Sequence, residues 1–206
     1  MDSRGSQTNS RLETFCDGVF AIALTLLIID IKIPAMREIN NNHDLWFALR
    51  HIAPSIYSFV LSFIIIFITW VNHHNGSKLV NRSSASFMYA NGFLLLIVVF
   101  IPFPTSLMGE YIDTDHAAPA VMLYNAVLAL QAVGWMLIAR AAMKNELYKN
   151  EKAKVAIQLN GKYSFFAFAL YTMCAILAFW FPHTIAFITL VTWIFWLILG
   201  INLKHE

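Results

Sequence analysis

The chain has 206 residues, of which 59% are hydrophobic and 13% are charged, and its formal net charge is +2. Soluble domains carry about a quarter charged residues, so this balance excludes a single soluble core. The apolar residues fall into six runs that each approach the roughly 20 residues needed to cross a bilayer as a helix. We therefore predict an all-α integral membrane protein.

Residues 1–10 are polar and lack an apolar period, so we expect a short disordered cytoplasmic tail. Residues 11–206 are expected to form a single transmembrane domain. Acidic residues before the first apolar run argue against a cleaved signal peptide, so this run should remain in the mature protein. The six predicted helices cover residues 11–32, 45–71, 87–108, 117–143, 163–181 and 184–203. Pro102 and Pro104 are expected to bend the outer end of the third.

The basic residues fall in alternate segments of the chain. All but three of the 14 lysines and arginines lie in the N-terminal segment, the second-to-third loop, the fourth-to-fifth region and the C-terminus; the exceptions are Lys32, Arg37 and Arg50. Basic residues are retained on the cytoplasmic side, so we predict a cell-membrane protein with both termini in the cytoplasm. The basic stretch 144–162 interrupts two predicted spans and also carries acidic residues, which favours topological charge over a nucleic-acid partner.

The first predicted span carries charge near its inner end. Asp17 precedes the uncharged run 18–29, which is too short to cross the membrane alone. Asp17 and Arg11 therefore lie at or inside the inner interface, where an ionised side chain needs a partner or water. The two residues are six positions apart, too far for the usual pairing along one helix, so each is expected to reach toward another helix.

The second predicted span supplies suitable partners at its end. Its last residues, TWVNHHNG at 69–76, bring Trp70, Asn72, His73 and His74 to the same interface. Metal binding is the alternative interpretation, but adjacent histidines on a helix point about 100° apart and no carboxylate lies one turn away. We therefore predict a hydrogen-bond network without a metal ion.

The first span also carries an aliphatic stripe. Ile22, Leu26 and Ile29 share one narrow side of the helix, and Asp17 lies about 140° from Ile22. The stripe and the carboxylate therefore face different neighbours. Lipid or helix packing is the usual role of such a stripe, with a pore lining as the alternative, and periodicity alone does not decide between them.

The run Arg11-x-x-x-Phe15-Cys16-Asp17-Gly18 resembles the signature of the transmembrane protein 175 family of potassium channels. The family pattern is Arg-x-x-x-Phe-Ser-Asp at the start of the first helix. Bacterial members are similar to this chain in length, in their six spans and in the Trp-Asn-His-rich end of the second span. Cys16 departs from the usual serine, which leaves open whether that small polar contact is kept.

The resemblance implies a homotetramer in the lipid bilayer, with the first helix of each subunit lining a central pore. No internal repeat is detectable, so a central pore requires several chains. Permeant potassium and other monovalent cations would pass an aliphatic constriction, with no cofactor and no Thr-Val-Gly-Tyr-Gly filter, so selectivity over sodium should be weak to moderate. The implied constriction residues are Ile22, Leu26 and Ile29, with Thr25 influencing selectivity. The implied structural network is Arg11, Phe15, Asp17, Trp70, Asn72, His73 and His74.

Two other classes of function remain as alternatives. A proton- or cation-coupled secondary transporter also places ionisable residues such as Asp17 and His73 in the membrane. Such transporters commonly show paired repeats and broken helices, but the sequence shows no repeat and no glycine or proline interruption within the first span. A membrane enzyme would need a catalytic motif such as His-Glu-x-x-His or Gly-x-Ser-x-Gly, and the sequence contains neither. We therefore expect a channel and not an enzyme.

Overall fold

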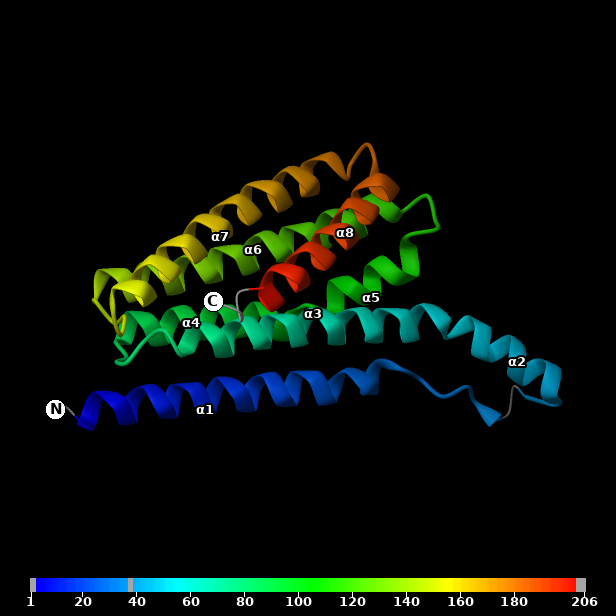
Figure 1. The fold of residues 1–206 in the computed structure, drawn as a ribbon. Helices are drawn as coiled ribbons and strands as arrows, with labels where there is room; N and C mark the ends of the chain where they lie inside the picture. The colour runs from blue at the N-terminus through cyan, green and yellow to red at the C-terminus, as the bar shows by residue number, and fades with distance from the viewer. Residues whose placement is uncertain (1–2, 37–38, 203–206) are drawn as a thin grey trace.

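The computed structural model describes residues 3–36 and 39–202, and their regular structure is helical. The elements in chain order are α1 (Ser3–Leu26), a 3₁₀ turn η1 (Leu27–Asp30), α2 (Asn42–His51), α3 (Ala53–Ser77), α4 (Ala85–Phe100), α5 (Pro102–Tyr111), α6 (Ala117–Lys144), α7 (Glu151–Leu177) and α8 (Pro182–Asn202). The long helices form an elongated bundle, in which α1 runs along one edge beside α3 (Figure 1).

Within the described residues, four helical stretches are long and apolar enough to cross a membrane: Asn9–Ile29, Ala53–Ser77, Ala85–Tyr111 and Ala117–Lys144. The C-terminal helix contributes a shorter apolar stretch, Pro182–Ile194. The protein is thus an all-helical, multi-pass membrane protein. The full count of six crossings, with α7 and α8 as the last two, stays a prediction.

Prolines set two of the helix boundaries. The third predicted span is interrupted at Ile101, and α5 restarts at Pro102. A second break lies at Ile52, where α2 ends and α3 begins with Pro54 in its first turn. Proline lacks a backbone N–H and cannot continue the hydrogen-bond ladder of the preceding turn, which explains both positions. The membrane-crossing part of the second span therefore begins at Ala53, later than expected.

The first helix begins before its expected boundary. α1 starts at Ser3, inside the segment 1–10 for which we expected a disordered tail. Two contacts support these early turns: Asn9 Nδ2 donates to the Val80 carbonyl at 3.4 Å, and Thr14 Oγ1 donates to the Ser10 carbonyl at 2.9 Å. The first of these contacts is tertiary, so a local sequence pattern does not predict it.

α6 lies at the centre of the fold and packs against α4, α5, α7 and α8. The close approach of α6 to α4 depends on Gly134, because a Cβ atom there would meet Leu94 Cα at 3.2 Å. Buried side-chain hydrogen bonds also join the helices. Gln131 Nε2 on α6 donates to Thr69 Oγ1 on α3 at 2.8 Å, and Thr189 Oγ1 on α8 donates to Asn125 Oδ1 on α6 at 2.9 Å. Such pairing satisfies polar groups that neither lipid nor an apolar core can solvate.

One end of the bundle is closed by two connections, residues 78–84 between α3 and α4 and residues 145–150 between α6 and α7. We call this end the basic end, because both connections carry lysine or arginine. The amide of Asn81 donates to the Leu147 carbonyl at 3.0 Å, and the amide of Lys149 donates to the Leu79 carbonyl at 2.9 Å. The two connections therefore hold the ends of four helices together.

Candidate functional site

The first helix and the 3₁₀ turn η1 that continues it, which holds Leu27 and Ile29, present two different apolar faces. Cys16, Phe20, Ala23 and Leu27 recur at spacings of three and four residues, and all four are buried against the rest of the subunit. A second set recurs on another side of the helix and remains uncovered in the subunit: Ile22 is 59% exposed, Leu26 53% and Ile29 60%. The stripe expected from the sequence is therefore available to lipid or to another chain.

Two further residues of the predicted site also lie on exposed sides of α1. Phe15 is 60% exposed and falls seven residues before Ile22, hence on the same side of the helix. Its side chain therefore does not face the core of its own subunit. Thr25 is exposed, and its hydroxyl donates within the helix to the Ala21 and Ile22 carbonyls, each at 3.0 Å. The lone pairs of its oxygen remain as acceptors.

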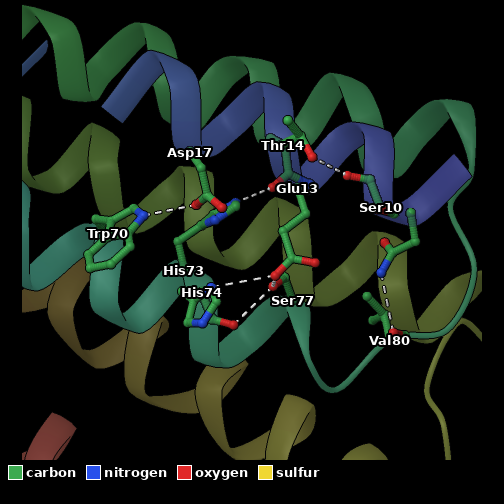
Figure 2. A network of polar contacts seen from close by, with 11 residues as sticks. Ser10, Glu13, Thr14, Asp17, Trp70, His73, His74, Ser77 and Val80 are labelled. Atoms are coloured by element: carbon green, nitrogen blue, oxygen red, sulfur yellow. Dashed lines mark hydrogen bonds and ion pairs between the residues drawn. The ribbon is translucent and has the colours of Figure 1, made fainter. Parts of the chain in front are cut away.

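Toward the basic end, α1 meets α3 through two carboxylates (Figure 2). Trp70 Nε1 donates to Asp17 Oδ1 at 2.8 Å, and Ser77 Oγ donates to Glu13 Oε1 at 2.8 Å. His74 Nδ1 lies 3.4 Å from the same Glu13 oxygen. The rings of Trp70 and His74 stack with centroids 5.7 Å apart. These contacts join the middle of α1 to the last turns of α3.

His73 faces a different neighbour from His74. Its Nε2 lies 2.7 Å from Asn91 Oδ1 on α4, and the Asn91 amide nitrogen donates to the Phe87 carbonyl at 2.7 Å. Since that amide donates elsewhere, its oxygen is free to accept, which assigns the Nε2–H tautomer to His73. Phe20 on α1 packs against the His73 ring at 5.4 Å between centroids. His73 thus links α1, α3 and α4.

The remaining two residues of the predicted network are placed differently. Arg11 is exposed on α1, and the hydrogen bond described for Asp17 comes from Trp70. Asn72 is half-buried and lines a cavity between the helices. The structure therefore brings Asp17 and Trp70 together directly, whereas His73 and His74 meet Asn91 and Glu13.

Sequence reasoning missed Glu13, Ser77 and Asn91. A signal for Glu13 was present, because it lies four residues before Asp17 and residues four apart share one side of a helix. Both carboxylates therefore face α3. Ser77 ends α3 and Asn91 lies in the middle of α4, and the sequence carries no pattern that distinguishes either from other polar residues of a membrane helix.

Glu13, Asp17 and His74 also form a group with metal-ligating chemistry. One ligand atom of each residue lies within 4.8 Å of the others, and all three side chains are half-buried. The group combines two carboxylates with one imidazole, so it has a negative charge when the imidazole is neutral. Such a group can hold a cation.

A cavity of about 470 Å³ lies at this region, between α1, α3, α4, α6, α7 and α8. Its wall includes the buried polar side chains of Thr69, His73, Asn91 and Gln131. Most of its other lining residues are apolar or aromatic. The cavity belongs to a single chain and does not depend on any neighbour.

Several known proteins are similar to this chain in sequence and in fold. Residues 11–102 match the family model described as endosomal/lysosomal potassium channel TMEM175. A potassium channel of Chamaesiphon minutus is 38% identical over 170 residues, which cover 82% of this chain and 83% of that protein. A potassium channel of Streptomyces collinus is 42% identical over 135 residues, covering 63% of this chain and 64% of that protein. The crystal structure of a lysosomal potassium-selective channel TMEM175 homolog from Chamaesiphon minutus superposes with a TM-score of 0.77 at 31% identity, covering 94% of this chain and 98% of that one.

The apolar helices and the polar contacts between them define a polytopic helical membrane protein, and its relatives are of the channel class. Within that class, the chain belongs to the TMEM175 family. This is a family of ion channels, which is not a class of enzyme.

Proposed function

We infer that this chain is a potassium-permeable channel, and we propose that it conducts as a homotetramer in which α1 of each subunit lines a shared pore. Residues 11–206 form its single transmembrane domain, with six crossings and both termini in the cytoplasm. The basic end then faces the cytoplasm, as the distribution of lysine and arginine favours. The mechanism needs no cofactor, and potassium is the permeant ion.

The observation that carries the proposal is the uncovered stripe of α1. Ile22, Leu26 and Ile29 are each more than half exposed in the subunit, on a helix whose other apolar face is buried. Thr25 adds an exposed hydroxyl about 60° away from Ile22, on a helix side where lipid contact would favour an apolar residue. In the proposed homotetramer, this face contributes rings of aliphatic side chains and one ring of hydroxyl groups. Such rings suit a narrow ion path.

The proposed mechanism is gating by dewetting. A narrow ring of Ile22 side chains excludes water when the pore is closed, and a modest rotation or widening of α1 lets a partly hydrated ion pass. Leu26 and Ile29 form further rings toward the outside, and the Thr25 hydroxyls replace part of the hydration shell of the ion. A pore of this kind has no rigid carbonyl cage, so its preference for potassium over sodium is weak to moderate.

The signature residues have a supporting role in this proposal. Asp17 and Trp70 hold α1 against α3, and His73 extends the contact to α4 through Asn91. Arg11 and Phe15, which are exposed in the single subunit, are positioned to contact neighbouring subunits. Asn72 and His74 complete the network at the basic end of the bundle.

The experiment is flux through the purified protein in liposomes. Under bi-ionic conditions, with potassium on one side and sodium on the other, the reversal potential should show a modest potassium preference, and single-channel events should appear at low protein density. Strong potassium selectivity would contradict an aliphatic pore. Flux that saturates at low ion concentration without unitary events would contradict a channel.

The cavity inside each chain favours one second candidate, a proton- or cation-coupled secondary transporter. Its buried polar wall, which includes His73 and Gln131, resembles a carrier path that needs no neighbouring subunit. The two candidates differ in the effect of substituting Ile22. A shared pore depends on that residue, whereas a path through each chain does not.

A further inference from the structure

We propose that a pocket at the end of the bundle opposite the basic end binds one phospholipid whose headgroup carries a phosphate and a primary ammonium, as in phosphatidylethanolamine. The pocket has a volume of about 580 Å³ and lies between α3, α5, α6 and α8. It is formed within a single chain. The proposal therefore does not depend on how the protein conducts ions.

Two buried polar side chains line this pocket with hydrogen bonds left to make. Tyr124 on α6 is 2% exposed and Trp193 on α8 is 8% exposed, and neither its hydroxyl nor its Nε1, respectively, makes a hydrogen bond of standard geometry with a described residue. The two side chains are neighbours, but an indole N–H only donates, so Trp193 cannot accept the proton of the Tyr124 hydroxyl. A buried donor without an acceptor is costly, so the pair favours a ligand that brings an acceptor oxygen.

The depth of these donors matches the ester carbonyls of a phospholipid. Tyr124 lies seven residues, or about 10 Å, inside the apolar span that begins at Ala117. The headgroup layer of a leaflet is roughly 5–7 Å thick, so the donors lie just below it, where the ester carbonyls are found. Since both donor atoms are buried, the carbonyl reaches them through a small displacement of the Trp193 indole.

The wall between these donors and the end of the bundle suits an acyl chain. It includes Leu61 on α3, Met108 on α5 and Leu190 on α8. Apolar space of this kind does not hold ordered water, which needs several polar partners for each molecule. A lipid fills it with hydrocarbon and still supplies the acceptor oxygen.

The mouth of the pocket carries one charge of each sign. Arg50 and Asp113 both line the pocket and are both exposed. Neither takes part in an ion pair among the described residues. A guanidinium binds phosphate through two parallel hydrogen bonds, and a carboxylate accepts the N–H donors of a primary ammonium. The pair is therefore complementary to a phosphoethanolamine headgroup, whereas a choline headgroup has no N–H donor and a glycerol headgroup has no positive charge.

Binding is measured by native mass spectrometry of the purified full-length protein, stripped of lipid in detergent. Phosphatidylethanolamine, phosphatidylcholine and phosphatidylglycerol with identical acyl chains are then added separately. We expect one phosphatidylethanolamine per chain, bound at least about fivefold more tightly than the other two, which is the factor that one hydrogen bond of ordinary net strength supplies. Tyr124→Phe should weaken this binding by roughly fivefold. Asp113→Asn should abolish the headgroup preference, and Arg50→Gln should weaken all three lipids.

The matched controls are Tyr111→Phe and Asp115→Asn, which change an exposed tyrosine and an exposed aspartate at the same end of the bundle but outside the pocket wall. Both should bind phosphatidylethanolamine as the unaltered chain does. Thermal unfolding in lipid-free detergent checks the Tyr124 variant separately. Because Tyr124→Phe removes a donor that lacks an acceptor, its unfolding temperature should equal or exceed that of the unaltered chain and should rise less when phosphatidylethanolamine is added.

Three results would overturn the proposal. Equal affinity of the unaltered chain for the three lipids would mean that any acyl chain covers the groove, and that result needs no variant to fold. Failure of the assembled protein to retain lipid would mean that a neighbouring subunit fills the pocket. Binding to Tyr124→Phe as tight as to the controls, or a large loss of its stability without lipid, would mean that the Tyr124 hydroxyl is satisfied within the chain.

Discussion

Ile22 is the residue on which the proposed conduction mechanism depends. Its side chain is 59% exposed in the subunit, although it lies on a helix that also buries Phe20 completely. An exposed isoleucine in a membrane protein has two possible neighbours, lipid or another chain. The two possibilities predict different results when the side chain is made polar. A side chain that faces lipid does not line the ion path, so its substitution leaves ion flux unchanged.

Replacing Ile22 with asparagine should increase potassium flux. The amide keeps water in the constriction and so lowers the free energy of hydrating it. We therefore expect potassium flux to rise roughly several-fold. The measurement is potassium efflux from liposomes at equal protein density. The matched control is Ile176→Asn, since Ile176 is 57% exposed on α7 and lies outside the proposed pore. Equal flux in both variants would remove Ile22 from the gate.

Thr25 should set part of the preference for potassium. Replacing it with valine keeps the shape of the side chain and removes the hydroxyl, so the potassium-to-sodium permeability ratio should fall toward unity while flux persists. The bi-ionic reversal potential measures the ratio. Thr25→Ser, which retains the hydroxyl, should keep a potassium preference, and a loss of preference in both variants would show that packing rather than the hydroxyl is responsible.

One contact between the residues of the predicted network, that of Asp17 with Trp70, follows from topology. The contact of Asp17 with Trp70 needs only that the first helix start and the second end at the same interface. The contacts of His74 with Glu13 and of His73 with Asn91 depend on the rotation of α3 about its axis. That rotation is set by packing across the whole bundle, so the sequence alone could not assign each histidine to its partner.

At the scale of helices, the close contact of α4 with α6 depends on Gly134. Gly134→Ala places a methyl group 3.2 Å from Leu94 Cα, and overpacking of this kind typically costs about 1–3 kcal/mol against the gain of about 1 kcal/mol that alanine brings to a helix. Gly92→Ala is the control, because nothing described lies within 4 Å of its Cβ position and alanine favours the helix by about 1 kcal/mol. Thermal unfolding in detergent should therefore rank Gly134→Ala below the unaltered chain and Gly92→Ala at or above it. The reverse order would mean that α4 and α6 are not in close contact.

These helix boundaries have local causes. The breaks at Pro54 and Pro102 follow from proline chemistry, and the sequence located the second of them. The start of α7 at Glu151, well before the expected boundary at Tyr163, follows from the Asn150 cap, whose Oδ1 accepts from the Ala153 amide at 2.9 Å. Hydropathy marks where a helix enters the membrane and not where the helix begins, which explains why the apolar pattern gave a later start.

At the scale of the whole molecule, the central claim is that α1 helices from several chains surround a common ion path. α1 lies at the edge of the bundle (Figure 1). Its aliphatic stripe and the neighbouring Thr25 hydroxyl are exposed in the single chain, which supports this claim. The chain also places its polar contacts on the other flank of α1, where they fix the helix without blocking that stripe. One helix can thus be anchored to its own subunit and still face its copies.

The most direct test is chemical modification of Ile22→Cys in liposomes with a water-soluble thiol reagent. The native Cys16 and Cys174 are buried, so unaltered protein and Ile176→Cys serve as controls. The account predicts that potassium flux through Ile22→Cys falls sharply on modification, while flux through both controls persists. Undiminished flux through Ile22→Cys, once mass spectrometry shows that the introduced thiol has reacted, would contradict a pore lined by α1.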